Sequence, residues 1–365
     1  MLRKCSRIRA VLRWLPSLVA VVALGQALGS EEQPAGETPP VLKVPEPQIN
    51  VIRDDHSADR WEVEQKAVDQ MVLAGLQEVT GKEGATDAWR SLVTPEDTVG
   101  IKVNAGPGRI GGTRSEVVDA VIRALLAAKV PAKQIVIWDT KLKELRSAQF
   151  DRLAKRHGVR LAGSLDTGWD ESVAYDESTL GTLIEGDLEF KPGEETISRK
   201  SHLTRLLTQE ITRIISIQPL INHNRVGVSG HLVGLTRGVV DNDRRFDVAT
   251  VILTEALPNI IALENEKQER YIGDRIALCI TDALYVQYLG QSKALLHYTE
   301  PLGQLWFSSD PVALDIFGIE TLEAKRQDLE IEFQPPRSKL YENATTVLIG
   351  ESDPKRRKVE YLKRN

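Results

Sequence analysis

Short apolar runs alternate with segments of helical periodicity along most of this chain, and this alternation limits the possible folds more than any other feature of the sequence. Residues 94–104 pass from a polar turn into an apolar run, residues 115–129 carry apolar side chains at helical spacing, and residues 134–139 form a second apolar run. A strand, a helix and a strand in this order predict two parallel strands joined by a crossover helix.

The same alternation continues to the C-terminus. Further helices are predicted at 63–79, 152–159 and 311–326, and further strands at 213–219, 275–283, 304–310 and 345–350. The segment around 163–200 is polar, lacks clear periodicity and is interpreted as an insertion or a small subdomain. We therefore expect one α/β domain over 49–350, with an open, mostly parallel sheet and helices on both faces. A basic tail over 351–365 is interpreted as a solvated helix end.

Residues 1–29 have the layout of a secretory signal peptide, because residues 1–13 are basic and residues 14–28 are almost entirely apolar. A membrane anchor is the alternative, but this apolar run contains Pro16 and is shorter than the ~20 residues that span a bilayer. We expect export by the general secretory (Sec) route to the periplasm or the extracellular space, with no stable membrane span after cleavage. The Pro- and Glu-rich residues 30–48 are expected to form a flexible linker.

Charge and cysteine content exclude several classes of function. The formal net charge is -5, and five of the 47 Lys and Arg residues lie in the expected signal peptide, which leaves 42 basic against 52 acidic residues. Such an acidic chain is a poor binder of phosphate backbones, so no nucleic-acid partner is expected. After cleavage Cys279 is the only cysteine in the sequence, which rules out a disulfide within the chain and an iron–sulfur cluster. In its apolar run, Cys279 is interpreted as a buried hydrophobic residue.

A glycine-rich loop, Gly106–Gly112, lies between a predicted strand and a predicted helix and matches G-x-G-x-x-G. In this context backbone N–H groups and a helix N-terminus can bind an anion. The side chains of Asn104 and Arg109 would then point toward this anion. A dinucleotide site is one alternative, although Asp139, the nearest acid that ends the next strand, is farther along the chain than the motif requires. A plain structural turn is the other. Residues 113–116 fit a capping box for the helix.

The densest polar stretch, residues 222–246, follows the strand predicted at 213–219. His223 and His231 are the candidate general acid or base, because histidine titrates near neutral pH. As metal ligands the two histidines would lack a standard spacing. The alternative is a polar surface loop in which Asn and Asp satisfy turns and Arg pairs with Asp. The other residues expected to bind substrate in this stretch are Asn222, Arg237 and Asp241.

Two aspartates at predicted strand ends, Asp282 and Asp310, are the candidate ligands of a divalent metal. Asp310 precedes Pro311, and this pair is also typical of a helix start, where the carboxylate accepts hydrogen bonds from the first turn. Asp315 has apolar neighbours on the same predicted helix, so it lies either on the solvent face or in a cleft.

Several of these segments, in this order, resemble the uncharacterised family called domain of unknown function 362. The matching pieces are VGIKVN, GTRSEVVDAVIRALLAAKVPAKQIVIWD, ISIQPLINHNRVGVSGHLVGLTRGVVDN, ITDAL and FSSDPVALD, which span about residues 95–320. The resemblance supports the fold and the location of the site but implies no activity, because the family has no settled one. Where that family has a Lys-Asn pair, this chain has Val233 and Gly234. Some relatives also carry a ferredoxin-like iron–sulfur module, for which this chain lacks the cysteines.

Three functions stay open from the sequence. The first is an exported enzyme that acts on an anionic small molecule or polymer, with or without a divalent metal. Its reaction is unassigned, because the chain has no nucleophile elbow and no H-E-x-x-H motif. The second is a non-catalytic protein of the cell envelope that binds a ligand or a metal. The third is a scaffold in which the polar stretch only closes the sheet.

Overall fold

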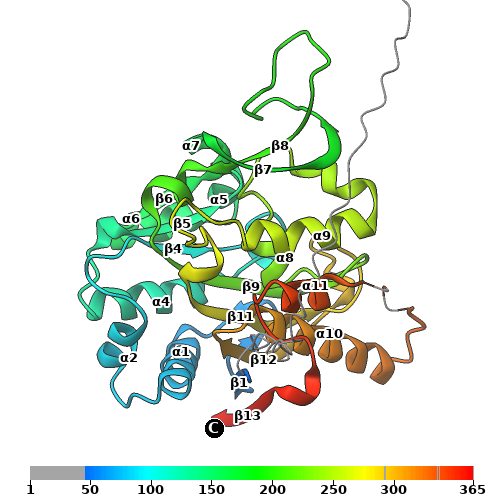
Figure 1. The fold of residues 1–365 in the computed structure, drawn as a ribbon. Coiled ribbons are helices and arrows are strands. Elements are labelled where there is room, and N and C mark those ends of the chain that lie inside the picture. The colour runs from blue at the N-terminus through cyan, green and yellow to red at the C-terminus, as the bar shows by residue number, and fades with distance from the viewer. Residues whose placement is uncertain (1–45, 292, 335, 337, 365) are drawn as a thin grey trace, which may run out of the picture. The chain divides into compact units, whose positions relative to one another are not determined.

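The structure is a computed structural model that describes residues 46–291, 293–334, 336 and 338–364. The expected signal peptide at 1–29 and nearly all of the expected linker at 30–48 lie outside these residues. Within the described chain, a central sheet of nine strands has the order β13, β1, β12, β11, β9, β4, β5, β6, with β10 paired to β9 (Figure 1).

The sheet is mixed and mostly parallel, as the sequence predicts. Strands β11, β9, β4, β5 and β6 are parallel neighbours, and β1 runs parallel to β13. Only β12 and the short β10 run antiparallel to their neighbours. The strands of the sheet are β1 (Gln48–Asp54), β4 (Val99–Lys102), β5 (Ile135–Asp139), β6 (Arg160–Gly163), β9 (Arg213–His223), β10 (Gly227–Val228), β11 (Ile276–Gln287), β12 (Thr299–Ser308) and β13 (Lys358–Arg364).

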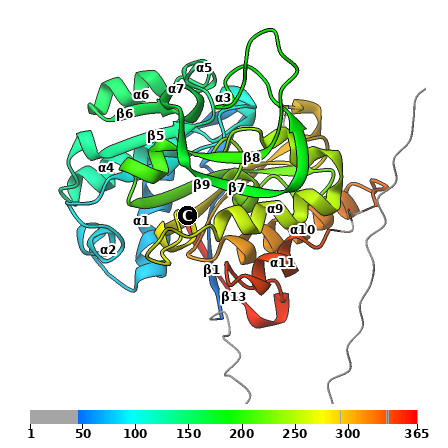
Figure 2. The same cartoon turned by 45° about the horizontal axis from the view of Figure 1, so that its top comes forward.

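Helices cover both faces of the sheet and bury two separate hydrophobic clusters (Figure 2). On one face lie α1 (Gln65–Thr80), α2 (Ala85–Leu92), α4 (Ser115–Ala127), α5 (Leu142–Ser147) and α6 (Phe150–His157). On the other face lie α8 (His231–Gly234), α9 (Thr250–Ile261), α10 (Pro311–Asp328) and α11 (Leu340–Thr346). This arrangement confirms the predicted α/β fold.

Helix α4 forms where its apolar residues predict it, but its start differs from the prediction. Val117, Val121 and Leu125 form a fully buried stripe. The capping box expected at 113–116 is absent, because the Thr113 hydroxyl donates to the carbonyl of Ile217 in β9 instead. The N-terminus of α4 is capped by a carboxylate from another element of the sheet.

The polar insertion expected around 163–200 consists mainly of an antiparallel hairpin outside the central sheet. Its strands are β7 (Trp169–Thr182) and β8 (Ile197–Thr204), and the short helix α7 (Ser164–Thr167) precedes them. The loop between the two strands projects away from the sheet (Figure 1). The hairpin packs on the 3₁₀ helix η3 (Asp243–Val248), which follows β9 in the chain.

Two predictions for the C-terminal part are wrong. The strand expected at 345–350 is instead the end of α11 and the turn that follows it, where Leu348 adopts a left-handed backbone with φ 58°. The basic tail expected over 351–365 contains β13, which pairs with β1 along its whole length and forms one edge of the sheet. Among the described residues, no helix combines the length and the apolar character needed to cross a bilayer.

Candidate functional site

The order of the strands creates a switch point between β4 and β9. From β4 the chain passes through α4 to β5 on one side, whereas from β9 it passes through α9 to β11 on the other side. The crevice at the carboxyl ends of two such strands is the usual ligand site of an open α/β sheet. A cavity of about 400 Å³ lies at this place.

The cavity is lined by the ends of three parallel strands and by the segment that follows β9. Opposite Lys102, the last residue of β4, β9 has Ser216, and β9 continues to His223, which forms one wall. Three residues expected from the sequence border the cavity: Asn104, His223 and Arg237. The other polar residues around it are Lys102, Asp139, Thr140, Glu144, Arg225, Ser229, Asp247 and Gln291.

A buried ion pair lies in the cavity wall. Lys102 Nζ donates to Asp139 Oδ1 at 2.7 Å and to the carbonyl of Val103 at 3.1 Å. Asp139 Oδ2 accepts a hydrogen bond from the backbone N–H of Ala105 at 2.8 Å. An ammonium has three hydrogens, so these two contacts leave one donor of Lys102 unused.

Two guanidinium groups in the cavity share one carboxylate. Arg237 Nη2 donates to Asp247 Oδ1, and Arg225 Nη1 lies 3.5 Å from the same oxygen. Arg225 Nη1 also donates to the backbone carbonyl of Asp247 at 2.6 Å. Planar guanidinium groups with spare N–H donors suit carboxylate, phosphate or sulfate.

His223 is a neutral group in the cavity wall. The backbone N–H of Arg225 donates to His223 Nδ1 at 3.3 Å, and His223 Nε2 lies 3.2 Å from the side-chain amide nitrogen of Gln291, which is also a donor. Burial lowers the pKa of His223 to about 4, and the positive charge of Arg237 acts in the same direction. At neutral pH the ring is therefore uncharged.

The structure does not bring His231 to the cavity. His231 is the first residue of α8, and its side chain is fully buried, with Nδ1 2.9 Å from Ser216 Oγ and Nε2 3.1 Å from Thr281 Oγ1. Burial lowers the pKa of His231 to about 3. The carboxylate of Asp315 accepts the backbone N–H of His231 at 2.6 Å, so this aspartate caps α8 and lies neither on the solvent face nor in the cavity.

Two further expected ligand residues also lie elsewhere. Asn222 is fully buried behind the cavity, where its side chain accepts from Arg326 Nη1 at 3.1 Å and donates to the carbonyl of Gly290 at 2.7 Å. Asp241 contacts the β7–β8 hairpin, where it accepts the backbone N–H of Leu188 at 2.8 Å.

The glycine-rich loop does not form a phosphate cradle. Residues Gly108–Gly111 form a short helix, α3, on which Arg109 is exposed beside a small pocket next to Trp61. Asp282 Oδ2 accepts the backbone N–H of Arg114 at 2.9 Å, so a carboxylate of the chain itself occupies the N-terminus of α4. A dinucleotide pyrophosphate would need that position.

Asp282 and Asp310 serve two different helices and do not meet. Asp310 Oδ1 accepts the backbone N–H of Ala313 at 2.8 Å, which confirms the helix start predicted at Pro311. Burial raises the pKa of Asp310 to about 6. Among the described residues, no group of three or more His, Cys, Asp or Glu side chains is arranged to hold a metal ion.

Lys102 and Asp247 are site residues that the sequence does not single out, and Asp139 is considered in the sequence only as the acid of a dinucleotide motif. A lysine in an otherwise apolar strand, with an aspartate at the end of the next strand, is the signal that points to Lys102 and Asp139. Asp247 carries no such signal, because it lies far along the chain in η3. Val233 and Gly234 also border the cavity, so the positions where the resembled family has Lys-Asn face the site here.

The chain has a distant structural neighbour among solved proteins. It is a protein from Thermotoga maritima, a target of the Northeast Structural Genomics Consortium, with 15% sequence identity and a TM-score of 0.38. The match covers 75% of this chain and 60% of the other, so the chain spans less than two thirds of the length of that protein. No family model and no curated protein matches the chain.

Proposed function

We propose that the chain binds an anionic small molecule in the cavity between β4 and β9. The observation that carries the proposal is the convergence of Lys102, Asn104, His223 and Arg237 on one cavity at the switch point of the sheet. These residues come from three separate parts of the chain, and each brings a polar side chain to the cavity. A volume of about 400 Å³ is in the usual range for small-molecule sites.

The expected roles follow from charge and geometry. Lys102 and Arg237 supply positive charge, since each keeps a donor beyond those used in its ion pair. Asn104 and the neutral ring of His223 supply uncharged polar groups that orient the ligand. Arg237 and Arg225 act on His223 as positive charges and Asp247 opposes them, so a negatively charged ligand would pair with the donors that the arginines keep.

Catalysis on the bound anion is the second candidate. The observation that favours it is the Lys102–Asp139 pair in the cavity wall, because an ammonium and a carboxylate in contact can pass a proton to or from a ligand. The alternative is a binding protein with no turnover. Product formation from a bound anion, lost in Lys102→Gln while the folded structure is kept, would decide for the enzyme.

Binding is tested by calorimetry and thermal shift with sulfate, phosphate, pyrophosphate and citrate. We expect at least one of these anions to stabilise the protein, and Arg237→Met to weaken its binding by about tenfold or more, as expected for the loss of a charged hydrogen bond. Arg109→Met is the matched control, because Arg109 is exposed outside the cavity. Equal binding by wild type and Arg237→Met would refute the proposal.

We also propose that the chain is exported and belongs with domain of unknown function 362. Export is supported by the basic and apolar halves of residues 1–29, and the family by the segments matched over about residues 95–320. Expression of the full chain in a bacterial host tests export. A mature protein that begins at Ser30 and is recovered outside the cytoplasm supports it, and an uncleaved cytoplasmic protein contradicts it.

A further inference from the structure

The segment that brings Arg237 to the cavity returns to the cavity at Asp247, and we call residues 237–247 the cavity loop. Its two ends hold each other, because Arg237 Nη2 donates to Asp247 Oδ1. Inside the loop, Arg237 Nη1 donates to the backbone carbonyl of Asp243 at 3.2 Å. The position of Arg237 in the cavity therefore depends on the conformation of this loop.

The β7–β8 hairpin holds the middle of the cavity loop through Arg245. The guanidinium of Arg245 is fully buried and donates to the carbonyls of Tyr175 and Thr179 in β7, at 3.0 and 2.7 Å. Its Nε donates to Ser201 Oγ in β8 at 2.9 Å. One side chain of the cavity loop thus binds both strands of the hairpin.

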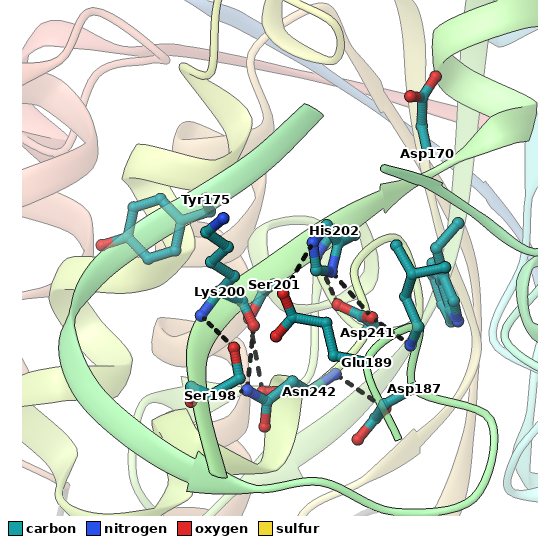
Figure 3. A network of polar contacts seen from close by, with 12 residues as sticks. Asp170, Tyr175, Asp187, Glu189, Ser198, Lys200, Ser201, His202, Asp241 and Asn242 are labelled. Carbon is teal, nitrogen blue, oxygen red and sulfur yellow. Dashed lines mark hydrogen bonds and ion pairs between the residues drawn. The ribbon is translucent and has the colours of Figure 1, made fainter. Parts of the chain in front are cut away.

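Asn242 makes a second connection to the hairpin. Its backbone is left-handed, with φ 44°, and its Nδ2 donates to the carbonyls of Ser198 and Lys200 in β8, at 3.1 and 3.0 Å (Figure 3). A non-glycine residue keeps a left-handed backbone when surrounding contacts hold it, and these two hydrogen bonds hold Asn242.

A buried histidine lies at the centre of this contact. His202 in β8 is 4% exposed, and its Nδ1 lies 3.2 Å from Asp241 Oδ2, while its backbone N–H donates to Asp241 Oδ1. On its other side, His202 Nε2 lies 3.9 Å from Glu189 Oε1 in the loop of the hairpin (Figure 3). Lys200 is the cationic group whose charge opposes that of a protonated His202.

Asp187 connects the hairpin loop to the same place. Its Oδ1 accepts the backbone N–H of Asn242 at 3.0 Å, and its Oδ2 accepts that of Ile184 at 2.8 Å. The carboxylates of Asp241 and Asp243 repel a negative charge on Asp187. A histidine and a carboxyl group are therefore both built into the contact between hairpin and cavity loop.

We propose that the β7–β8 hairpin is a pH-responsive clamp on the cavity loop, which holds Arg237 in its binding position in acid and releases it as the pH rises. The effect on binding rests on the proposed function, whereas the clamp itself does not. The two are tested separately.

Both titratable groups act in the same direction. Its hydrogen bond with Asp241 raises the pKa of His202 above its usual 6.5, so the stabilisation by protonated His202 is complete below that pH and is lost as the pH rises through the raised value. Burial raises the pKa of Asp187 above its usual 3.8, so its ionisation opposes the contact as the pH rises. Both groups therefore weaken the clamp as the pH rises, Asp187 from above pH 3.8 and His202 from above pH 6.5.

Hydrogen–deuterium exchange tests the clamp without a ligand. With intrinsic rates corrected, we expect amides of residues 237–247 to be protected about threefold or more less at pH 8 than at pH 5.5, relative to amides of β9. His202→Gln should remove most of this difference, and His56→Gln, at an exposed site, should retain it. Equal protection at both pH values, or an undiminished difference in His202→Gln, would overturn the clamp.

Calorimetric titration with sulfate tests the link to the cavity, because the charge of sulfate is constant between pH 5.5 and 8. We expect sulfate to bind several-fold more weakly at pH 8 in wild type and equally at both pH values in His202→Gln. Burial raises the pKa of Asp315 to about 7, but this residue caps α8, so only a dependence that disappears in His202→Gln supports the clamp. If none of sulfate, phosphate, pyrophosphate and citrate binds at any pH, the proposed function alone is contradicted, since the exchange experiment still decides on the clamp. If wild type and His202→Gln bind sulfate with the same pH dependence, the clamp is overturned and the proposed function is kept.

Discussion

Lys102 Nζ and Asp139 Oδ1 lie 2.7 Å apart at the carboxyl ends of two neighbouring parallel strands, and both side chains are almost completely buried. Two charges taken out of water in this way stabilise each other, so each depends on its partner. The pair also lies in the wall of the cavity between β4 and β9. It therefore links the stability of the sheet to the chemistry of the proposed site.

Removal of one partner is expected to be costly. Lys102→Met leaves the buried carboxylate of Asp139 without its cation, and should lower the free energy of unfolding by about 3 to 5 kcal/mol. In the double variant Lys102→Met/Asp139→Asn no charge is left, so most of this loss should be recovered. Urea denaturation at pH 7 measures both. Lys141→Met, which removes an exposed ion pair with Glu144, should change stability by less than about 1 kcal/mol. Equal losses in the single and double variants would show that the two charges do not depend on each other.

His223 should make the protein less stable in acid. Its pKa, usually 6.5, is lowered to about 4 in the folded state, so the unfolded chain binds more protons between these values and acidification favours unfolding. Between pH 7.5 and 4.5, His223→Gln should lose about 2 to 3 kcal/mol less stability than wild type. Denaturation at the two pH values measures this difference, and NMR titration of the ring measures the pKa directly.

The exposed His56 provides the control for this prediction. His56→Gln should follow the wild-type pH dependence, because the ring of His56 is exposed and lies outside the cavity. A measured pKa near 6.5 for His223 would contradict the prediction that burial disfavours its protonated form.

The central part of the fold follows from local sequence patterns, and the edges do not. The apolar runs of β4, β5, β9 and β11 are buried on both faces, so their composition alone identifies them. β13 has the sequence KVEYLKR and is only partly buried at a sheet edge, so its charges resemble those of a solvated tail.

The site is predictable only where ligand residues follow a recognisable strand. Asn104 lies two residues beyond β4 and His223 is the last residue of β9, and the strand order places them together. Asp282 occupies a similar position in the sequence but points at the N-terminus of α4, because an unsatisfied helix N-terminus attracts a carboxylate. The strand pattern cannot distinguish a carboxylate that caps a distant helix from one that faces a ligand.

Gly238 in the cavity loop should tolerate no side chain. Its φ is +72°, and a Cβ there would lie 1.9 Å from Thr140 Oγ1 in the cavity wall. Gly193, with φ +83°, has open space around it and is the matched control. Gly193→Ala should cost only the backbone penalty of about 1 to 2 kcal/mol, and Gly238→Ala at least about 1 kcal/mol more, since the loop or the wall must also move. Chemical denaturation compares the two, and equal costs would mean that the loop is free to shift away from Thr140.

The carboxylate of Asp282 has either a structural role or a role as a metal ligand, and stability measurements can distinguish the two. Asp282 Oδ2 accepts from the backbone N–H of Arg114 at 2.9 Å and lies 3.3 Å from the guanidinium of the same residue. Asp282→Asn should therefore lower the free energy of unfolding by about 3 kcal/mol, because it leaves a buried guanidinium unpaired and weakens the cap of α4. Asp87→Asn, in the exposed first turn of α2, should cost less than about 1 kcal/mol. If Asp282 serves only Arg114, EDTA should leave the thermal midpoint of wild type unchanged and divalent cations should not restore the variant. A midpoint that falls with EDTA in wild type, but not in Asp282→Asn, would assign a metal to this carboxylate instead.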